Sequence, residues 1–168
     1  MALAVVVSSG ALKLLIEDVF GVDVARYEAL FFDETFWRAL AEELGLAREV
    51  TKLERTPDRI VRHVRCEPHK QHEAFEKTRA GYVEELDYDT RAKQGKWRTI
   101  PNVFTDRVRT EGTIEFVAVA GGCKRIVRGE IDVRRAFGFG RIIEKMIVGE
   151  IEKSYLKSTA FTRDWLAR

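Results

Sequence analysis

The sequence predicts an α+β fold in which a curved antiparallel sheet wraps around one long C-terminal helix. Residues 12–135 contain several runs of alternating apolar and polar residues, the pattern of half-buried strands. Turn-forming dipeptides separate these runs, and residues 138–168 have helical spacing instead. A single helix at the end of a strand-rich chain has only its own sheet to pack against, and a sheet that grips a helix leaves room for a ligand.

The first strand is expected over Leu12–Val22, and residues 1–11 are expected to form a tail that is disordered or weakly packed. The apolar run Ala2–Val7 is short and has no positive charge before Lys13, so it makes a poor signal peptide. Residues 12–168 are therefore interpreted as a single domain.

Two short helices are predicted after the first strand. Asp23 and Asp33 have the side chain of an N-cap residue, and apolar residues follow each at helical spacing. Gly45 is expected to end the second helix, because glycine adopts the left-handed conformation found at helix C-termini.

Six further strands are expected between these helices and the C-terminal helix, which makes seven in all. Pro57-Asp58, Gln94-Gly95 and Gly121-Gly122 are predicted to form tight turns between neighbouring strands. The six strands are Arg48–Arg55, Arg59–Cys66, Tyr82–Thr90, Lys96–Ile100, Arg107–Ala120 and Cys123–Arg135.

The C-terminal helix is predicted by apolar residues that recur three or four positions apart. These apolar residues form one stripe along the helix, and most charged residues of the segment lie off it. The simplest interpretation of the stripe is core packing. Part of such a stripe also lines any pocket beneath it. The stripe contains Phe139, Ile142, Ile143, Met146, Ile147, Ile151, Tyr155, Phe161 and Trp165.

Composition limits the classes of function and of compartment. The net charge of +2 over 168 residues argues against a dedicated nucleic-acid-binding protein. Residues 96–141 hold ten basic and five acidic residues, a bias that fits either transient contact with an anionic membrane surface or an ordinary solvated strand face. Two cysteines make no disulfide framework, so a cytoplasmic location is expected; the oligomeric state is left open.

Two motifs and the order of elements carry a resemblance to a known superfamily. The motifs are Phe31-Phe32-Asp33-Glu34-Thr35-Phe36-Trp37, between the two short helices, and Phe139-Gly140-Arg141-Ile142-Ile143-Glu144, at the start of the last helix. On these features residues 12–166 resemble the START-like, polyketide-cyclase and birch-pollen-allergen (SRPBCC) superfamily, most closely its uncharacterised bacterial members.

This resemblance implies a helix-grip fold, with a curved seven-stranded antiparallel sheet around the last helix. Members of the superfamily bind or transfer lipids, sterols and polyketide-like molecules, and a minority catalyse ring closure or hydrolysis. The expected function is therefore binding or transfer of a hydrophobic small molecule in an internal cavity, with no cofactor.

Arg62 and Glu84 are charged residues on strand faces that are otherwise apolar. A buried charge needs a partner, so we hypothesise an ion pair between them on the concave face of the sheet. The alternative is that both side chains reach solvent, because a bulge or a one-residue shift places them on the outer face of the sheet. The candidate ligand-binding residues are Arg62, Tyr82, Glu84, Tyr88, Trp97, Ile114, Phe116, Ile142, Met146 and Ile147.

Two other classes of function stay open at this point. One is a cyclase- or hydrolase-type enzyme that uses Glu84 as general acid or base, although the sequence indicates no catalytic set. The other is an interaction module whose core is filled, which a structure with no pocket above about 300 Å³ would favour. The side chains expected to fill that core are Tyr88, Trp97, Phe116, Met146 and Tyr155.

His63, Cys66, His69 and His72 are residue types that bind zinc, but their spacing does not predict a metal site. His63 and Cys66 are an odd number of residues apart on one strand, so they project from opposite faces. The Gly138-Phe139-Gly140 segment is no phosphate-binding loop either, because the third glycine of that motif is missing.

Overall fold

The computed structural model describes residues 2–8, 11–69, 81–102, 108–133 and 140–168. Within these ranges the strands form one eight-stranded antiparallel sheet in the order β1-β2-β8-β7-β6-β5-β4-β3. The strands are β1 (Ala2–Ser8), β2 (Ala11–Phe20), β3 (Leu46–Arg55), β4 (Arg59–Pro68), β5 (Tyr82–Asp89), β6 (Gln94–Pro101), β7 (Val108–Val119) and β8 (Gly122–Val133). The helices are α1 (Val24–Phe31), α2 (Glu34–Leu44) and α3 (Gly140–Leu166).

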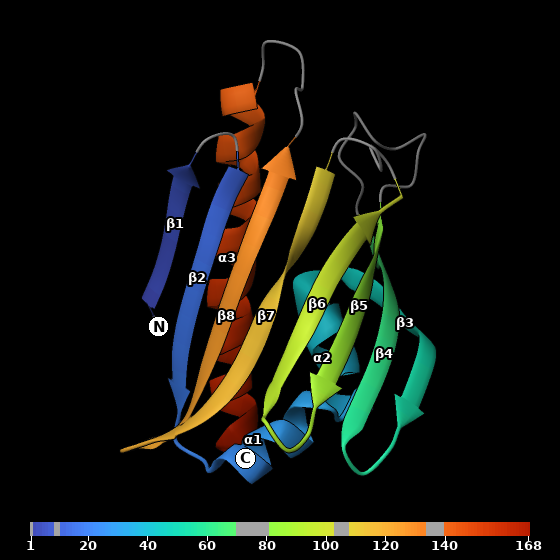
Figure 1. Ribbon diagram of the computed structural model, residues 1–168, viewed down its shortest axis with the longest axis vertical. Coiled ribbons are helices and arrows are strands. Elements are labelled where there is room, and N and C mark those ends of the chain that lie inside the picture. Colours follow the sequence, from blue (N-terminus) through green and yellow to red (C-terminus); the bar gives the residue numbers. More distant parts are fainter. Residues whose placement is uncertain (1, 9–10, 70–80, 103–107, 134–139) are drawn as a thin grey trace.

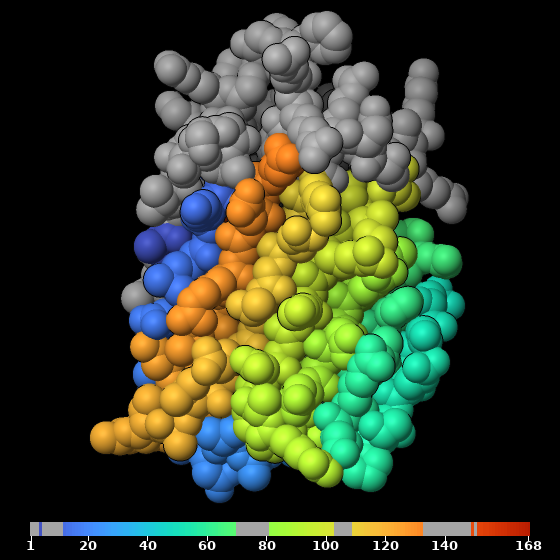
Figure 2. All heavy atoms as spheres, viewed as in Figure 1, coloured from blue at the N-terminus to red at the C-terminus, as the bar shows by residue number. Residues whose placement is uncertain are grey.

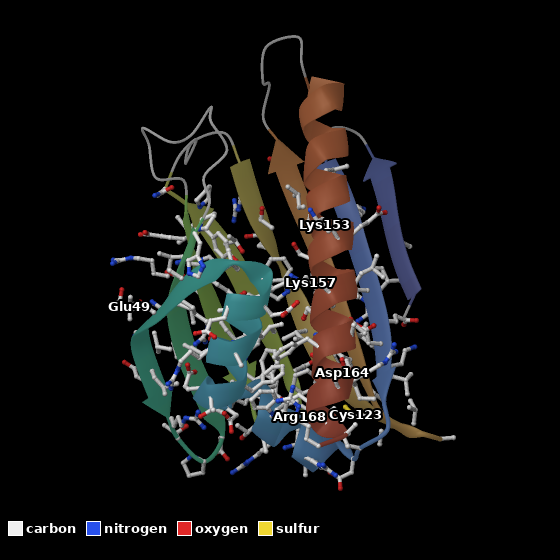
Figure 3. All side chains as sticks on the ribbon, turned by 180° about the vertical axis from the view of Figure 1, so that it is seen from behind. Glu49, Cys123, Lys153, Lys157, Asp164 and Arg168 are labelled. Carbon is white, nitrogen blue, oxygen red and sulfur yellow. The ribbon has the colours of Figure 1, made fainter. Side chains whose placement is uncertain are left out.

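The three helices cover one face of the curved sheet. Figure 1 shows α3 behind β2, β8 and β7, with α2 behind the strands at the other side and α1 across the lower end. Seen from behind, α3 and α2 lie side by side in front of the sheet (Figure 3). The predicted helix-grip fold is thereby confirmed, with β2–β8 as the seven predicted strands. No helix of the described ranges is long and apolar enough to cross a membrane.

The helix boundaries follow the capping residues that the sequence indicates. The side chain of Asp23 accepts a hydrogen bond from the backbone N–H of Arg26 at 2.7 Å, and that of Asp33 accepts one from Phe36 at 2.9 Å. Gly45 ends α2 in the left-handed conformation, with φ of 71°. All three predicted caps are confirmed.

Residues 2–8 are a strand, where a tail was expected. β1 pairs with β2 over its whole length, from Ala2 opposite Glu17 to Ser8 opposite Ala11. The apolar run in this segment therefore belongs to an edge strand, and the sheet has an eighth strand in the described chain.

The turn between β5 and β6 lies earlier than the sequence indicates. Thr90–Lys93 make the turn, because Asp89 accepts hydrogen bonds from the N–H groups of Arg91 and Ala92, both at 2.8 Å. The predicted Gln94-Gly95 turn is wrong: both residues belong to β6. Gly95 is instead a close-packing position, where a Cβ would lie 3.1 Å from the Tyr88 ring. The predicted Gly121-Gly122 turn has positive φ at both glycines.

The two faces of the sheet differ in chemistry. Inward-facing residues form an apolar core with the helices, which includes Leu14, Ile16, Ile114 and Val127. The outward face, turned to the viewer in Figure 2, carries ion pairs between neighbouring strands. The outward pairs include Arg59–Asp87, Arg98–Glu85, Arg128–Glu115 and Lys124–Glu17.

These outward ion pairs make the stability of the fold sensitive to acid. Arg59 binds Asp87 through two hydrogen bonds of 2.7 Å, and Arg59 holds the pKa of Asp87 below its ordinary value of 3.8. Arg98 likewise lowers the pKa of Glu85 from 4.5. A carboxyl whose folded-state pKa is depressed stabilises the fold above its unfolded-state pKa, and that contribution is lost as the pH falls through the folded-state pKa.

We therefore expect the unfolding temperature to fall as the pH drops below 4.5, with a shallower slope in Asp87→Asn and in Arg59→Gln. Thermal unfolding followed by circular dichroism, from neutral pH to below 3.8, measures both slopes. An acid slope that stays at its full value in both variants would show that this pair makes no contribution.

Candidate functional site

A cavity of about 380 Å³ lies between the concave face of the sheet and the helices α2 and α3. Strands β2 and β5–β8 supply one wall, and α2 and α3, together with Phe31 of α1, supply the other. Most of the lining side chains are aliphatic or aromatic. The described lining residues are Leu14, Phe31, Trp37, Leu40, Leu44, Tyr82, Glu84, Leu86, Trp97, Thr99, Thr110, Ile114, Arg125, Val127, Ile131, Ile151, Ser154, Tyr155 and Ser158.

Trp97 forms a flat part of this wall because two glycines lie next to it. In the sheet register Trp97 is opposite Gly112, which is opposite Gly129 on the next strand. A Cβ added at Gly112 would lie 2.7 Å from the indole, and one at Gly129 would lie 2.9 Å from it. The absence of these side chains lets the indole lie against the backbone of β7 and β8.

Polar groups form a row across one part of the wall. Glu84 is opposite Thr99, and Thr99 is opposite Thr110, so the three side chains occupy neighbouring positions on β5, β6 and β7. Tyr82 lies two residues from Glu84 on the same face, and burial raises the pKa of its hydroxyl, which therefore stays protonated. The row combines one carboxylate with neutral hydroxyl groups.

The predicted Arg62–Glu84 ion pair is present, and it links the core to the cavity. Arg62 Nη2 lies 3.6 Å from Glu84 Oε1; the arginine side chain is 1% exposed and the glutamate side chain 38% exposed. Arg62 also donates to the carbonyl of Phe31 at 3.2 Å. Its guanidinium lies 5.1–5.6 Å from the ring centroids of Phe31, Phe32 and Trp37. Arg62 therefore joins β4 to the helix pair and keeps Glu84 on the cavity wall.

A second buried ion pair, Arg125–Asp18, was not singled out from the sequence. Arg125 on β8 lines the cavity and donates to Asp18 on β2 at 2.5 Å, and it reaches Thr159 of α3 at 3.4 Å. Burial raises the pKa of the neighbouring Tyr27 to about 12 and also raises the pKa of Tyr155, so both phenols stay neutral. This pair connects the sheet to α3 at the cavity.

The candidate residues fall into three groups. Tyr82, Glu84, Trp97 and Ile114 line the cavity. The other two groups are Arg62, Tyr88 and Phe116, which are buried in the core and are absent from the described lining, and Ile142, Met146 and Ile147, whose side chains lie outside the described residues. The buried residues pack against other core side chains. The Phe116 ring lies 5.1 Å from the rings of Tyr27 and Phe31 and 5.6 Å from the ring of Tyr88.

The histidine and cysteine residues are separated by the sheet. His63 is on the outward face, 3.9 Å from Glu85, whereas Cys66 is buried on the inward face beside Tyr82. Across the described ranges no three His, Cys, Asp or Glu side chains are grouped as a metal site. His72 and Gly138-Phe139 lie outside the described residues.

Solved structures with the same fold include aromatase/cyclases and uncharacterised bacterial proteins. The ZhuI aromatase/cyclase of a Streptomyces species has a TM-score of 0.66 and 12% identity, with 94% of each chain covered. The Thermus thermophilus protein TTHA0849 has a TM-score of 0.63 and 18% identity, with 92% of this chain and 98% of that chain covered. The di-domain aromatase/cyclase StfQ of the steffimycin biosynthetic pathway has a TM-score of 0.55 and 9% identity, with 94% of this chain and 53% of that chain covered.

These identities are low, so the likeness establishes the fold alone. Curated proteins give no match to the chain. A sequence model of one family, described as "Protein of unknown function (DUF2505)", matches residues 17–166.

Proposed function

The chain belongs to the DUF2505 family, and for this member of it we propose that it binds a hydrophobic small molecule in the cavity between its sheet and the helices α2 and α3. The fold shared with ZhuI and StfQ supports the further proposal that the chain is a member of the START-like superfamily. The ligand would then be lipid-like, sterol-like or polyketide-like.

The observation that carries the proposal is the cavity itself. Its volume of about 380 Å³ falls in the range of small-molecule sites, about 300–1,000 Å³. Aliphatic side chains and two indole rings make most of its wall, so an apolar ligand would remove this surface from water. Burial of apolar area contributes roughly 25 cal/mol per Å² before the costs of association.

The polar row gives the bound molecule an orientation. Glu84, Thr99 and Thr110 can accept or donate hydrogen bonds on the sheet side, and Ser154 and Ser158 of α3 also line the cavity. A ligand with an apolar body and a hydroxyl or carbonyl group would place that group against the row. The rest of its surface would contact residues such as Leu14, Ile131 and Ile151.

Binding fits the site better than the two alternatives do. Glu84 is the acid–base group that an enzyme would use, but its carboxylate faces Arg62, and the described lining contains no histidine or cysteine to act with it. An interaction module with a filled core fits poorly as well, because the cavity exceeds the lower limit of about 300 Å³ for ligand sites.

Filling the cavity is expected to weaken binding. Ile151 lines the cavity from α3, so Ile151→Trp should place an indole in the ligand's space and weaken binding at least about tenfold, or about 1.4 kcal/mol. The probe is N-phenyl-1-naphthylamine, a neutral apolar dye whose fluorescence rises on leaving water. Titration of the dye into each protein gives its dissociation constant.

Leu156→Trp is the matched control on the same helix. Leu156 is 55% exposed and is absent from the described lining, so this variant should bind the dye like the unmodified protein. Equal affinity in all three proteins would place the dye elsewhere and would contradict the proposed site. Thermal unfolding of each protein checks that the fold is intact.

A further inference from the structure

We propose that β1 is a dimerisation edge: two copies of the chain join their β1 strands antiparallel about a two-fold axis at Val5. The two sheets then form one continuous sheet. This proposal is independent of ligand binding, because it rests on the edge of the sheet and not on its concave face.

One side of the β1 backbone faces away from the sheet. β1 is the terminal strand of the sheet, and in the described part of the chain it pairs with β2 alone. Every second residue of an edge strand directs its N–H and C=O groups away from the sheet, where they can pair with another strand.

The two edges of the sheet differ in how they are protected. The opposite edge strand, β3, carries five charged residues and an irregularity between Val50 and Lys52, and both features disfavour pairing with another strand. β1 reads Ala-Leu-Ala-Val-Val-Val-Ser and contains no charged residue and no proline. Such an uncharged run rich in β-branched residues is the kind of edge that pairs with another chain.

The partner that fits this edge is a second copy. A two-fold axis at Val5 places Ala2 opposite Ser8, Leu3 opposite Val7 and Ala4 opposite Val6, so all seven residues of β1 are paired. No charge opposes another in this register. Because directly opposite residues of antiparallel strands project to the same side, the concave faces of both copies lie on the same side of the joined sheet.

The outward surface beside β1 combines apolar and charged residues. Ala4 is exposed and lies opposite Leu15 on β2, which is itself 37% exposed, and Val19 further along β2 is 44% exposed. Lys13 and Glu17 alternate with these two residues on β2, and Glu17 pairs with Lys124. Comparably exposed apolar residues, Ile100 and Val119, lie on β6 and β7, so the proposal rests on the uncharged edge of β1 itself.

The mass of the protein in solution tests the proposal. Light scattering coupled to size exclusion should give twice the chain mass of 19.3 kDa in the micromolar range. Val5→Lys places two positive charges opposite each other at the axis, and we expect it to raise the dimer dissociation constant about tenfold or more. Leu53→Lys is the matched control: Leu53 is an exposed residue of the β3 edge, and its replacement should leave the dimer unchanged.

Cross-linking gives a second readout that does not depend on a destabilising charge. Val5→Cys should be joined into a covalent dimer by a short bismaleimide, since opposite Cβ atoms in paired strands are about 4.5–5.5 Å apart. Leu53→Cys should stay uncross-linked, and the native Cys66 and Cys123 are buried. A monomer throughout the concentration range, or a dimer that survives Val5→Lys with Val5→Cys uncross-linked, would overturn the proposal.

Discussion

Asp18→Ala is expected to lower the free energy of unfolding by about 3–5 kcal/mol, because it leaves the guanidinium of Arg125 buried without its carboxylate. Asp18 has an exposed fraction of 0% and Arg125 of 7%, and their contact is 2.5 Å. Arg125 also reaches Thr159, so loss of its partner disturbs the packing of α3 on the sheet. Urea unfolding followed by tryptophan fluorescence measures the change.

The outward face of the same two strands offers the matched control. Glu17, next to Asp18 in β2, pairs with Lys124 at 2.8 Å, and these two side chains are 31% and 28% exposed. Glu17→Ala should cost less than about 1 kcal/mol, since ion pairs at the surface contribute little. If Asp18→Ala and Glu17→Ala lower the free energy of unfolding by similar amounts, the buried pair stabilises the fold no more than the surface pair does.

Arg62→Ala is expected to cost about 3–5 kcal/mol, because a buried partner of an ion pair and much of a packed side chain are removed together. Arg62 contacts three aromatic rings and donates to the Phe31 carbonyl at the end of α1, where a positive charge also meets the negative end of the helix dipole. Its removal should loosen the helix pair from β4 and leave Glu84 without its partner. Arg62→Met should cost less, since it keeps the apolar stem among the rings.

Arg55 provides the control for this prediction. It lies on the neighbouring strand, donates to the Phe32 carbonyl at 3.1 Å and is exposed. Arg55→Ala should lower the free energy of unfolding by less than about 1.5 kcal/mol, the usual net value of one hydrogen bond. If Arg62→Ala and Arg62→Met both leave stability and dye binding unchanged, the role given to Arg62 is wrong.

Local signals predicted much of the fold because they depend on residues close in sequence. Asp23, Asp33 and Gly45 cap helices through contacts within four residues, and two adjacent glycines favour a tight turn wherever they occur. The β5–β6 turn was misplaced because two local signals compete. Gly95 has the residue type of a turn, but the Asp89 side chain fixes the turn four residues earlier, and Gly95 lies opposite Tyr88, where a Cβ would be close to the ring.

The alternation of side chains between the two faces of each strand predicted one of the two buried ion pairs of the site. The same alternation also marks the residues of the second pair. Arg62 and Glu84 stood out as charges on apolar faces, and they do meet. Asp18 shares a strand face with Leu14 and Ile16, and Arg125 shares one with Cys123 and Val127. Each is therefore also a charge on an otherwise apolar face. Their pairing across 107 residues needed the register of β2 with β8. β1 was missed because an uncharged N-terminal segment has no alternation to mark it as a strand.

Native mass spectrometry of freshly purified protein tests the central claim most directly. A hydrophobic ligand in the cavity predicts a mass that exceeds that of the 19.3 kDa chain, or of its dimer, by the mass of a small molecule for each chain, and solvent extraction releases this molecule as an apolar compound. Ile151→Trp, purified in parallel, should lack that compound while Leu156→Trp retains it. An unmodified protein that carries no extractable compound and binds no N-phenyl-1-naphthylamine would contradict a ligand-binding function for the cavity.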